Sequence, residues 1–196
     1  MHGLINRSIQ GFLRDTYGAA TWAEVAHLAR LGFDGFEPML SYDPALTDAV
    51  LAAAAEVLQR PRETVLEDLG TYLVSHPNCE GVRRLLRFGG ESFDDFIHSL
   101  EDLPERARLA LPDLHLPCLD LVEHGTGRYR LHITAPLAGA GHVMVGLLRA
   151  MADYYGALVL MEPREARAGA EAIDIQLLDQ RHSRGRAFDL VGRQGR

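Results

Sequence analysis

The sequence has 196 residues, of which 47% are hydrophobic and 24% are charged, a composition that indicates one packed globular domain and excludes a disordered chain. The net charge of −7 argues against a general nucleic-acid or membrane-surface binder. The two cysteines, Cys79 and Cys118, are too few for a disulfide framework or a four-thiolate zinc site.

The start of the chain, MHGLINRSIQ, lacks the apolar core of a signal peptide. No apolar run approaches the roughly 18 residues that a membrane span needs. We therefore expect a cytoplasmic protein that does not enter a membrane.

The N-terminal part of the sequence has the periodicity of α-helices. Apolar residues recur at helical spacing between Leu4 and Leu13. Thr21 and Glu24 form a capping-box pattern, which predicts that a second helix starts at Thr21. Gly32 is the predicted stop of that helix.

Prolines and capping residues delimit four more predicted helices. Proline fits the first turn of a helix, and Asp or Ser fits the position just before it. The predicted helices are an Ala-rich one from Asp43–Pro44 to near Gln59, one from Pro61 that His76–Pro77 interrupts, a short one over residues 79–88 that Gly89–Gly90 closes, and one over residues 93–103 that Ser92 caps.

After Pro117 the hydrophobic period changes from helical to alternating. The order of elements becomes two strands, a helix and two strands, which indicates an α+β fold with an antiparallel sheet backed by a helix. The predicted strands are Cys118–Val122, Tyr129–Thr134, Ala157–Glu162 and Ile173–Leu178, and the predicted helix is His142–Tyr155.

Several short motifs, in order and at consistent spacing, carry a family resemblance from Met1 to about residue 178. They are the start M-H-G-L-I-N with Tyr17-Gly18 and Trp22, Tyr42-Asp43 before the Ala-rich helix, LLRFGG-SF-DF-SL-DL, LPDL-LP, Leu131-His132 and VGLLRAMADYYG. With these motifs the chain resembles the haem nitric oxide/oxygen binding (H-NOX) family, which includes the haem domain of soluble guanylate cyclase.

The resemblance implies an H-NOX-like domain over residues 1–178, with b-type haem between two subdomains. The helical N-terminal subdomain is expected over about residues 1–60 and the α+β subdomain over about residues 61–178. Residues 179–196 are expected to form a basic, flexible tail or, alternatively, a docking arm. Five arginines lie in it: Arg181, Arg184, Arg186, Arg193 and Arg196.

Proline stands where the resemblance places the axial ligand of the haem iron. In the family this histidine follows Leu-x-x-Leu, and here that stretch reads Leu100-Glu101-Asp102-Leu103-Pro104. The eight-residue step from Pro104 to Pro112 supports this register. Proline has no donor atom for iron, which needs a basic axial ligand, and it disfavours helix at the preceding residue. We therefore expect the helix to end near Asp102 and a new turn to begin at Pro104.

The family's second motif, Y-x-S-x-R, binds the haem propionates, and its positions here hold Ile133, Ala135 and Leu137. Two propionates would lose charge-assisted donors that are worth roughly 1.5–3 kcal/mol each. Pro117 matches a family position that packs on haem. Losing the iron ligand and the propionate clamp together indicates release from haem binding.

The wall of the family's pocket keeps its apolar character. Close packing favours collapse of these side chains into the space, and the alternative is a pocket for a neutral apolar ligand. The wall residues are Phe93, Phe96, Leu100, Leu103, Met144 and Leu148.

Three other histidines are weak candidates for a metal or haem ligand. His98 lies six residues before Pro104, so on a helix it should face elsewhere. His76 is expected in a loop and His132 on a strand. If His76 and Cys79 met His115 and Cys118, which repeat the H-x-x-C spacing, the four would form a His₂Cys₂ zinc site.

Enzyme signals are weak, because the sequence has neither a phosphate-binding P-loop nor a G-x-S-x-G nucleophile motif. The resemblance implies a non-enzymatic sensory or regulatory domain that acts through a separate signalling protein, such as a cyclase or a kinase. The alternative function is a gas sensor that binds haem through a different axial ligand, or another apolar ligand in the same pocket.

Overall fold

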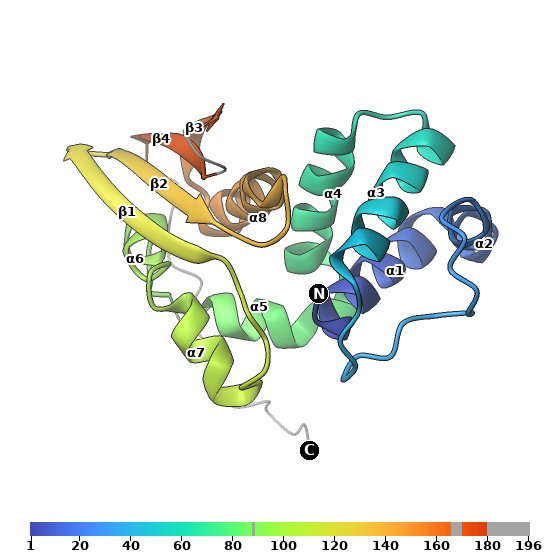
Figure 1. Cartoon of the computed structure of the whole chain (residues 1–196). Coiled ribbons are helices and arrows are strands. Elements are labelled where there is room, and N and C mark those ends of the chain that lie inside the picture. The colour runs from blue at the N-terminus through green and yellow to red at the C-terminus, as the bar shows by residue number, and fades with distance from the viewer. Residues whose placement is uncertain (88, 166–169, 180–196) are drawn as a thin grey trace, which may run out of the picture.

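The structure is a computed structural model that describes residues 1–87, 89–165 and 170–179. The first half of the chain is helical and the second half contains an antiparallel sheet with α8 packed on it, which confirms the predicted α+β class (Figure 1). The elements are α1 (Gly3–Tyr17), α2 (Ala19–Leu28), α3 (Pro44–Leu58), α4 (Arg62–Ser75), η1 (Pro77–Cys79), α5 (Glu80–Arg87), α6 (Phe93–His98), α7 (Leu103–Ala110), β1 (Cys118–Gly125), β2 (Arg128–Thr134), α8 (Ala140–Tyr155), β3 (Leu158–Glu165) and β4 (Glu171–Asp179).

The junction of α1 and α2 corrects the predicted capping box. Gly18 both ends α1 and begins α2, with φ of 96°, a value that glycine adopts without strain. Thr21 is therefore inside α2, where its hydroxyl donates to the carbonyl of Tyr17 as helical threonines do. Gly32 is not the stop either, because α2 already ends at Leu28.

The start signals of α3 and α4 act as predicted. The Asp43 side chain accepts from the amide of Ala45, with Pro44 in the first turn. Pro61 is the N-cap of α4, and His76 is its C-cap. As Figure 1 shows, α4 lies between the other N-terminal helices and α8.

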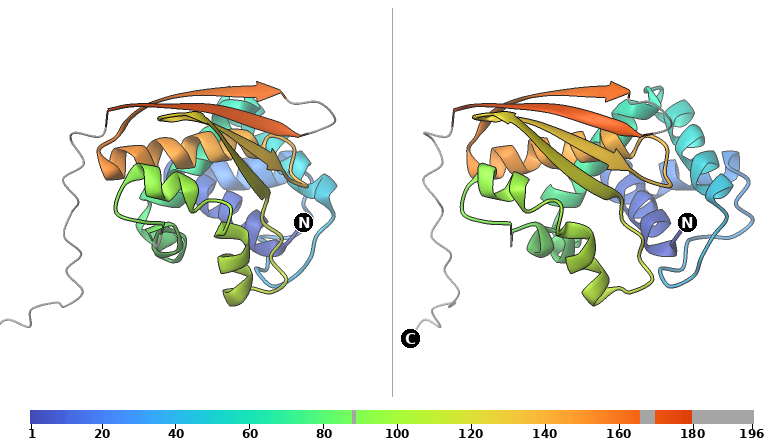
Figure 2. Two further views of the ribbon diagram at one scale, coloured as in Figure 1. Left: turned by 90° about the vertical axis from the view of Figure 1, so that its left-hand side faces the viewer. Right: turned by 60° about the vertical axis from the view of Figure 1, so that its left-hand side comes forward.

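The sheet has the strand order β1-β2-β4-β3, with every neighbouring pair antiparallel. Alternate residues of β2, namely Tyr129, Leu131 and Ile133, are buried, as a strand with one covered face requires. Figure 2 shows α8 beneath one face of the sheet, with α6 and α7 on the same side.

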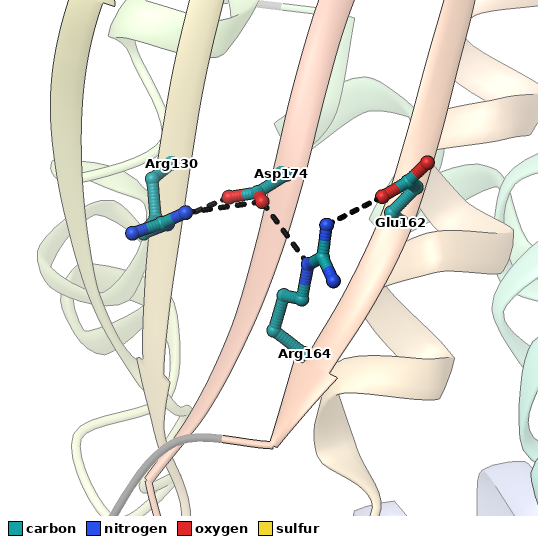
Figure 3. A network of polar contacts seen from close by, with 4 residues as sticks. All are labelled: Arg130, Glu162, Arg164 and Asp174. Atoms are coloured by element: carbon teal, nitrogen blue, oxygen red, sulfur yellow. Dashed lines mark hydrogen bonds and ion pairs between the residues drawn. The ribbon is translucent and has the colours of Figure 1, made fainter.

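A polar network crosses the other face of the sheet (Figure 3). Asp174 on β4 accepts from Arg130 Nε at 2.6 Å and Nη2 at 3.0 Å, and from Arg164 Nε at 3.2 Å. Arg164 Nη2 also donates to Glu162 at 2.7 Å. The pKa of Asp174 is lowered below its usual value, and the largest cause is the hydrogen bonding from the Arg130 guanidinium. Cross-strand pairs of this kind help to fix strand register.

Two glycines allow α4 and α8 to cross with their backbones in contact. A Cβ on Gly146 would lie 1.9 Å from the carbonyl oxygen of Glu67, and one on Gly70 would lie 2.0 Å from that of Val143. Around this crossing, Glu67 accepts from Arg149 and lies 3.3 Å from His142 Nδ1. The α4–α8 contact therefore joins the N-terminal helices to the sheet layer.

The buried side chains form two clusters, one on each side of this crossing. The first, the N-terminal cluster, contains residues of α1–α4, including Phe12, Leu51 and Leu66. The second, the sheet-side cluster, lies between the sheet, α6 and α8, and includes Leu131 and Leu148. The described residues contain no helix long and apolar enough to cross a membrane.

Candidate functional site

The segment around Pro104 contains a break in the helix, but not where the sequence predicted it. α6 ends at His98, residues 99–102 form turns, and α7 begins at Leu103 with Pro104 in its first turn. Asp102 is therefore the N-cap of the following helix instead of the end of the preceding one. Proline fits there because the first turn of a helix does not need its missing N–H.

Arg106 bridges this break, a role that the sequence did not indicate. Its Nη2 donates to the carbonyl oxygen of Ser99 at 2.9 Å, so α7 is tied back to the turn that precedes it. The Nε atom of Arg106 is buried without a partner among the described residues. A separation of seven residues between Arg106 and Ser99 matches no common sequence motif, so this contact could not be predicted from the sequence.

The three predicted clamp positions lie on and just after β2, and each belongs to or packs against one of the two clusters. Ile133 is 1% exposed and pairs with Leu119 of β1. Ala135 packs against the sheet-side cluster, and Leu137 packs against the N-terminal cluster. Pro117 is half-buried immediately before β1. None of these side chains can donate a hydrogen bond to a propionate.

The loop after β2 is held by an internal carboxylate that the sequence did not reveal. Glu171, the first residue of β4, accepts from the amides of Gly139 and Gly141 at 2.8 and 2.7 Å. A carboxylate at a helix N-terminus is favourable because it meets unpaired amides and the positive end of the helix dipole. The carboxylate of Glu171 therefore occupies the anion position at the N-terminus of α8.

The predicted wall residues pack against one another. Each is at most 6% exposed and all belong to the sheet-side cluster, together with Ile133. They are Phe93, Phe96, Leu100, Leu103, Met144 and Leu148. With no donor at the ligand or clamp positions, the residues present do not fit a haem held in the family's manner.

Two open cavities of about 460 Å³ each lie elsewhere. One is lined by residues of α6, the β1–β2 turn and the end of β4, and the other by residues of α4, the start of α8, β3 and β4. Neither contains any of the wall residues, so neither is the space that the family resemblance predicted.

His98 lies at the surface, where it contacts the sheet. Because α6 ends at this residue and α7 begins at Leu103, no continuous helix relates His98 to Pro104, contrary to the prediction. His98 Nδ1 donates to the carbonyl oxygen of Asp94, 2.8 Å away, and the His98 ring packs edge-on against the ring of Tyr129. Its side chain is 48% exposed.

The other histidine candidates lie apart. His132 is half-buried on β2, in register with Asp120 and Ala172, on the face opposite the buried residues. The described residues contain no group of three or more His, Cys, Asp or Glu side chains that could hold a metal ion. His76, Cys79, His115 and Cys118 are all described, so the structure does not bring them together as a zinc site.

His76 instead belongs to a polar cluster that joins α1 to the end of α4. Its ring stacks on Tyr72, with centroids 4.7 Å apart, and its Nδ1 lies 3.6 Å from Asp15. Asp15 accepts from the hydroxyl of Tyr72 at 2.6 Å and from the side-chain Nδ2 of Asn78 at 2.8 Å. The hydrogen bond from Tyr72, followed by that from Asn78, lowers the pKa of Asp15.

Replacing Asp15 with Asn should reduce stability at neutral pH and flatten its dependence on acid. The pKa of Asp15 is lower in the folded chain than the ordinary value of 3.8, so its contribution is present above about pH 4. It is lost as pH falls through the folded pKa, because the unfolded chain then binds more protons.

The measurement is urea unfolding at pH 7 and at several values below 4. We expect D15N to lose about 1 kcal/mol at pH 7 and less at lower pH, while the exposed-loop variant D113N follows the wild type. Equal losses at every pH would contradict the assigned role of the carboxylate.

The helical layer, the α4–α8 crossing and the four-stranded antiparallel sheet define the H-NOX class of fold. An unliganded Fe(II) H-NOX variant from K. algicida superimposes with a TM-score of 0.79, at 15% identity, over 91% of this chain and 97% of that one. The Fe(II)NO form of an H-NOX protein from S. oneidensis gives 0.75 at 16% identity, over 91% and 100%.

The sequence of this chain matches a known protein family. The Haem-NO-binding family model matches residues 2–162, and the chain belongs to this family. It is 25% identical to the soluble guanylate cyclase gcy-31 of Caenorhabditis elegans over 76% of this chain and 21% of that protein. It is 27% identical to the soluble guanylate cyclase subunit beta-2 of Rattus norvegicus, over 50% and 15%. The chain spans less than a third of these relatives.

Proposed function

We propose that this chain is a regulatory module of the Haem-NO-binding family that keeps the family's fold, works without haem and acts through a separate signalling protein. The observation that carries the proposal is the packing of the apolar wall residues on one another, beside Ile133 at a clamp position. Close-packed side chains leave no room for a tetrapyrrole.

The chemistry of the lining supports the same conclusion. A haem brings two carboxylates, and burying a carboxylate without a partner costs several kcal/mol. Pro104 supplies no iron donor, and Ile133, Ala135 and Leu137 supply no propionate donor. None of the eight histidines among the described residues is buried, so no imidazole lies within the wall cluster to replace the missing ligand.

The partner class is inferred from the relatives. Several of them are soluble guanylate cyclases by name, and this chain spans only a small share of each. We infer that a separate cyclase, kinase or comparable effector responds to the conformation of the module. We also infer that the module catalyses no reaction itself and that it works in the cytoplasm.

Replacing Pro104 with His tests the register of the ligand position. The variant should bind added ferric haem about tenfold more tightly than the wild type, since a factor of ten needs only 1.4 kcal/mol, and binding should stay weak because the clamp is still absent. The measurement is a haem titration followed by the Soret absorption.

The matched control is E105H, which places an imidazole one residue later on an exposed position of the same helix. It should bind haem no better than the wild type. If the wild type already binds one haem per chain and P104H does not change its affinity, then the assignment of Pro104 to the ligand position is wrong.

A further inference from the structure

The strand β3 forms one edge of the sheet, because it pairs with β4 and with no other strand of the described residues. The outer backbone N–H and C=O groups of an edge strand can accept a further strand, and charged side chains usually prevent this. Residues 157–161, which lead into β3 and form its first half, have no charged side chain. Leu158 and Leu160 are 60% and 55% exposed. This part of the edge therefore lacks the usual protection.

The second half of β3 is protected. Glu162 and Arg164 are charged, and Pro163 cannot donate a backbone hydrogen bond. Pro163 and Arg164 also line an open cavity together with Arg62 and Glu63 of α4, so this half of the strand lies close to α4. Within the described part of the chain, the unprotected length of the β3 edge is thus residues 157–161.

Pro163 also indicates which backbone groups of β3 face the open edge. An edge strand accommodates proline where the missing N–H would face away from the neighbouring strand. The backbone groups along an antiparallel strand alternate in direction, and the register with β4 is continuous from Val159 to Pro163. The N–H and C=O groups of Val159 and Met161 therefore face the same open edge as Pro163.

The unprotected segment is complementary to its own copy in antiparallel orientation. With a twofold axis at Val159, this residue lies opposite Val159 of the second copy. Leu158 then lies opposite Leu160, and such apolar cross-strand pairs are favourable. Ala157 lies opposite Met161, and both pack against the sheet-side cluster. The apolar layer beneath the sheet would thus continue from one copy into the other, as a self-complementary twofold contact requires.

Charge favours pairing through β3 over pairing through β1, the other edge of the sheet. β1 contains Asp120 and Glu123, and pairing with its own copy would bring these carboxylates together, which destabilises a strand pair. The net charge of −7 adds a general repulsion between copies. An uncharged contact segment adds no local repulsion to it, which makes residues 157–161 the part of the edges best suited to a second copy.

We propose that this chain forms a twofold-symmetric dimer through residues 157–161, which join the two four-stranded sheets into one continuous sheet. The outer face of the contact carries two Leu158–Leu160 pairs, and the backbone groups of Val159 and Met161 are hydrogen-bonded across it. A short strand pair is at the low end of interface sizes, so we expect a dissociation constant of about 10 µM.

Sedimentation velocity of the full chain tests the proposal. The wild type should change from one chain to two per particle as its concentration rises through about 10 µM. L160R should weaken the dimer by about tenfold or more, because two arginines would then lie diagonally across the axis on one face. The control V122R adds the same charge to β1 at a position that is 36% exposed, and it should dimerise like the wild type.

Cysteine cross-linking tests the register, in a C118S background that lacks the exposed thiol. V159C should form a disulfide-linked dimer on mild oxidation, because residues paired at the axis have Cα atoms about 5.5 Å apart. M161C should not, because residue 161 of one copy would lie about 13 Å from residue 161 of the other.

Three results would overturn the proposal. The first is a wild type that stays monomeric up to about 200 µM, which would leave this edge to a strand of another protein. The second is a folded L160R variant, as judged by circular dichroism, that dimerises as strongly as the wild type. The third is V159C cross-linking no better than M161C.

Discussion

Replacing Gly146 with Ala should destabilise the protein by about 3 kcal/mol or more, the upper end of what overpacking of a tight contact costs. The added methyl group would lie 1.9 Å from the carbonyl oxygen of Glu67 and 3.0 Å from the amide nitrogen of Thr71. Both atoms belong to the backbone of α4, so no side chain can rotate away. The two helices would have to separate.

Gly81 provides the matched control for this substitution. It is also within a helix, α5, but a Cβ there would meet no atom within 4 Å. G81A should be neutral or stabilise by up to about 1 kcal/mol, because alanine has the higher helix propensity. Thermal unfolding of both variants is the measurement, and a G146A variant as stable as G81A would contradict the close α4–α8 crossing.

The substitution Leu100→Ala should destabilise the protein by roughly 2–5 kcal/mol, the range for a buried leucine whose removal leaves a cavity. Leu100 is 0% exposed and is one of the wall residues predicted to line the family's pocket. If this space is filled by side chains, truncation creates a new apolar cavity, which a small apolar molecule such as benzene can then occupy.

The control Leu109→Ala removes the same atoms from α7, at a position that is 88% exposed, and should change stability by less than about 0.5 kcal/mol. Saturating benzene should raise the unfolding temperature of L100A but not that of the wild type. A wild type that benzene stabilises as much as L100A would show an open apolar pocket and favour the alternative function as a receptor for an apolar ligand.

The sequence predicted the elements whose signals are local. The alternation in β2 and the Asp43–Pro44 start of α3 depend on neighbouring residues, so both were readable from the chain. The helix break was predicted near Asp102, but the structure has it at residues 99–102, between α6 and α7. Proline is tolerated in the first turn of α7, and residues 99–102 have no strong sequence signature for a turn.

The contacts that the sequence could not reveal connect residues distant along the chain. Glu171 reaches the amides of Gly139 and Gly141 only once β4 lies beside β2, and Asp15 meets Tyr72 across the α1–α4 contact. The predicted capping box at Thr21 failed for another reason, because Gly18 can both end one helix and begin the next. Residue types alone carry the prediction that the haem positions lack an iron donor and a propionate clamp, and it stays a prediction.

The most direct measurement of haem-independent function is the visible spectrum of wild-type protein produced with abundant haem and then reduced under nitric oxide. We expect no Soret band approaching one haem per chain and no shift when nitric oxide is added. A stoichiometric ferrous Soret band that shifts with nitric oxide, and that disappears in a single His→Ala variant, would contradict it. That result would show that another histidine binds the iron, and it would make gas sensing the function of this chain.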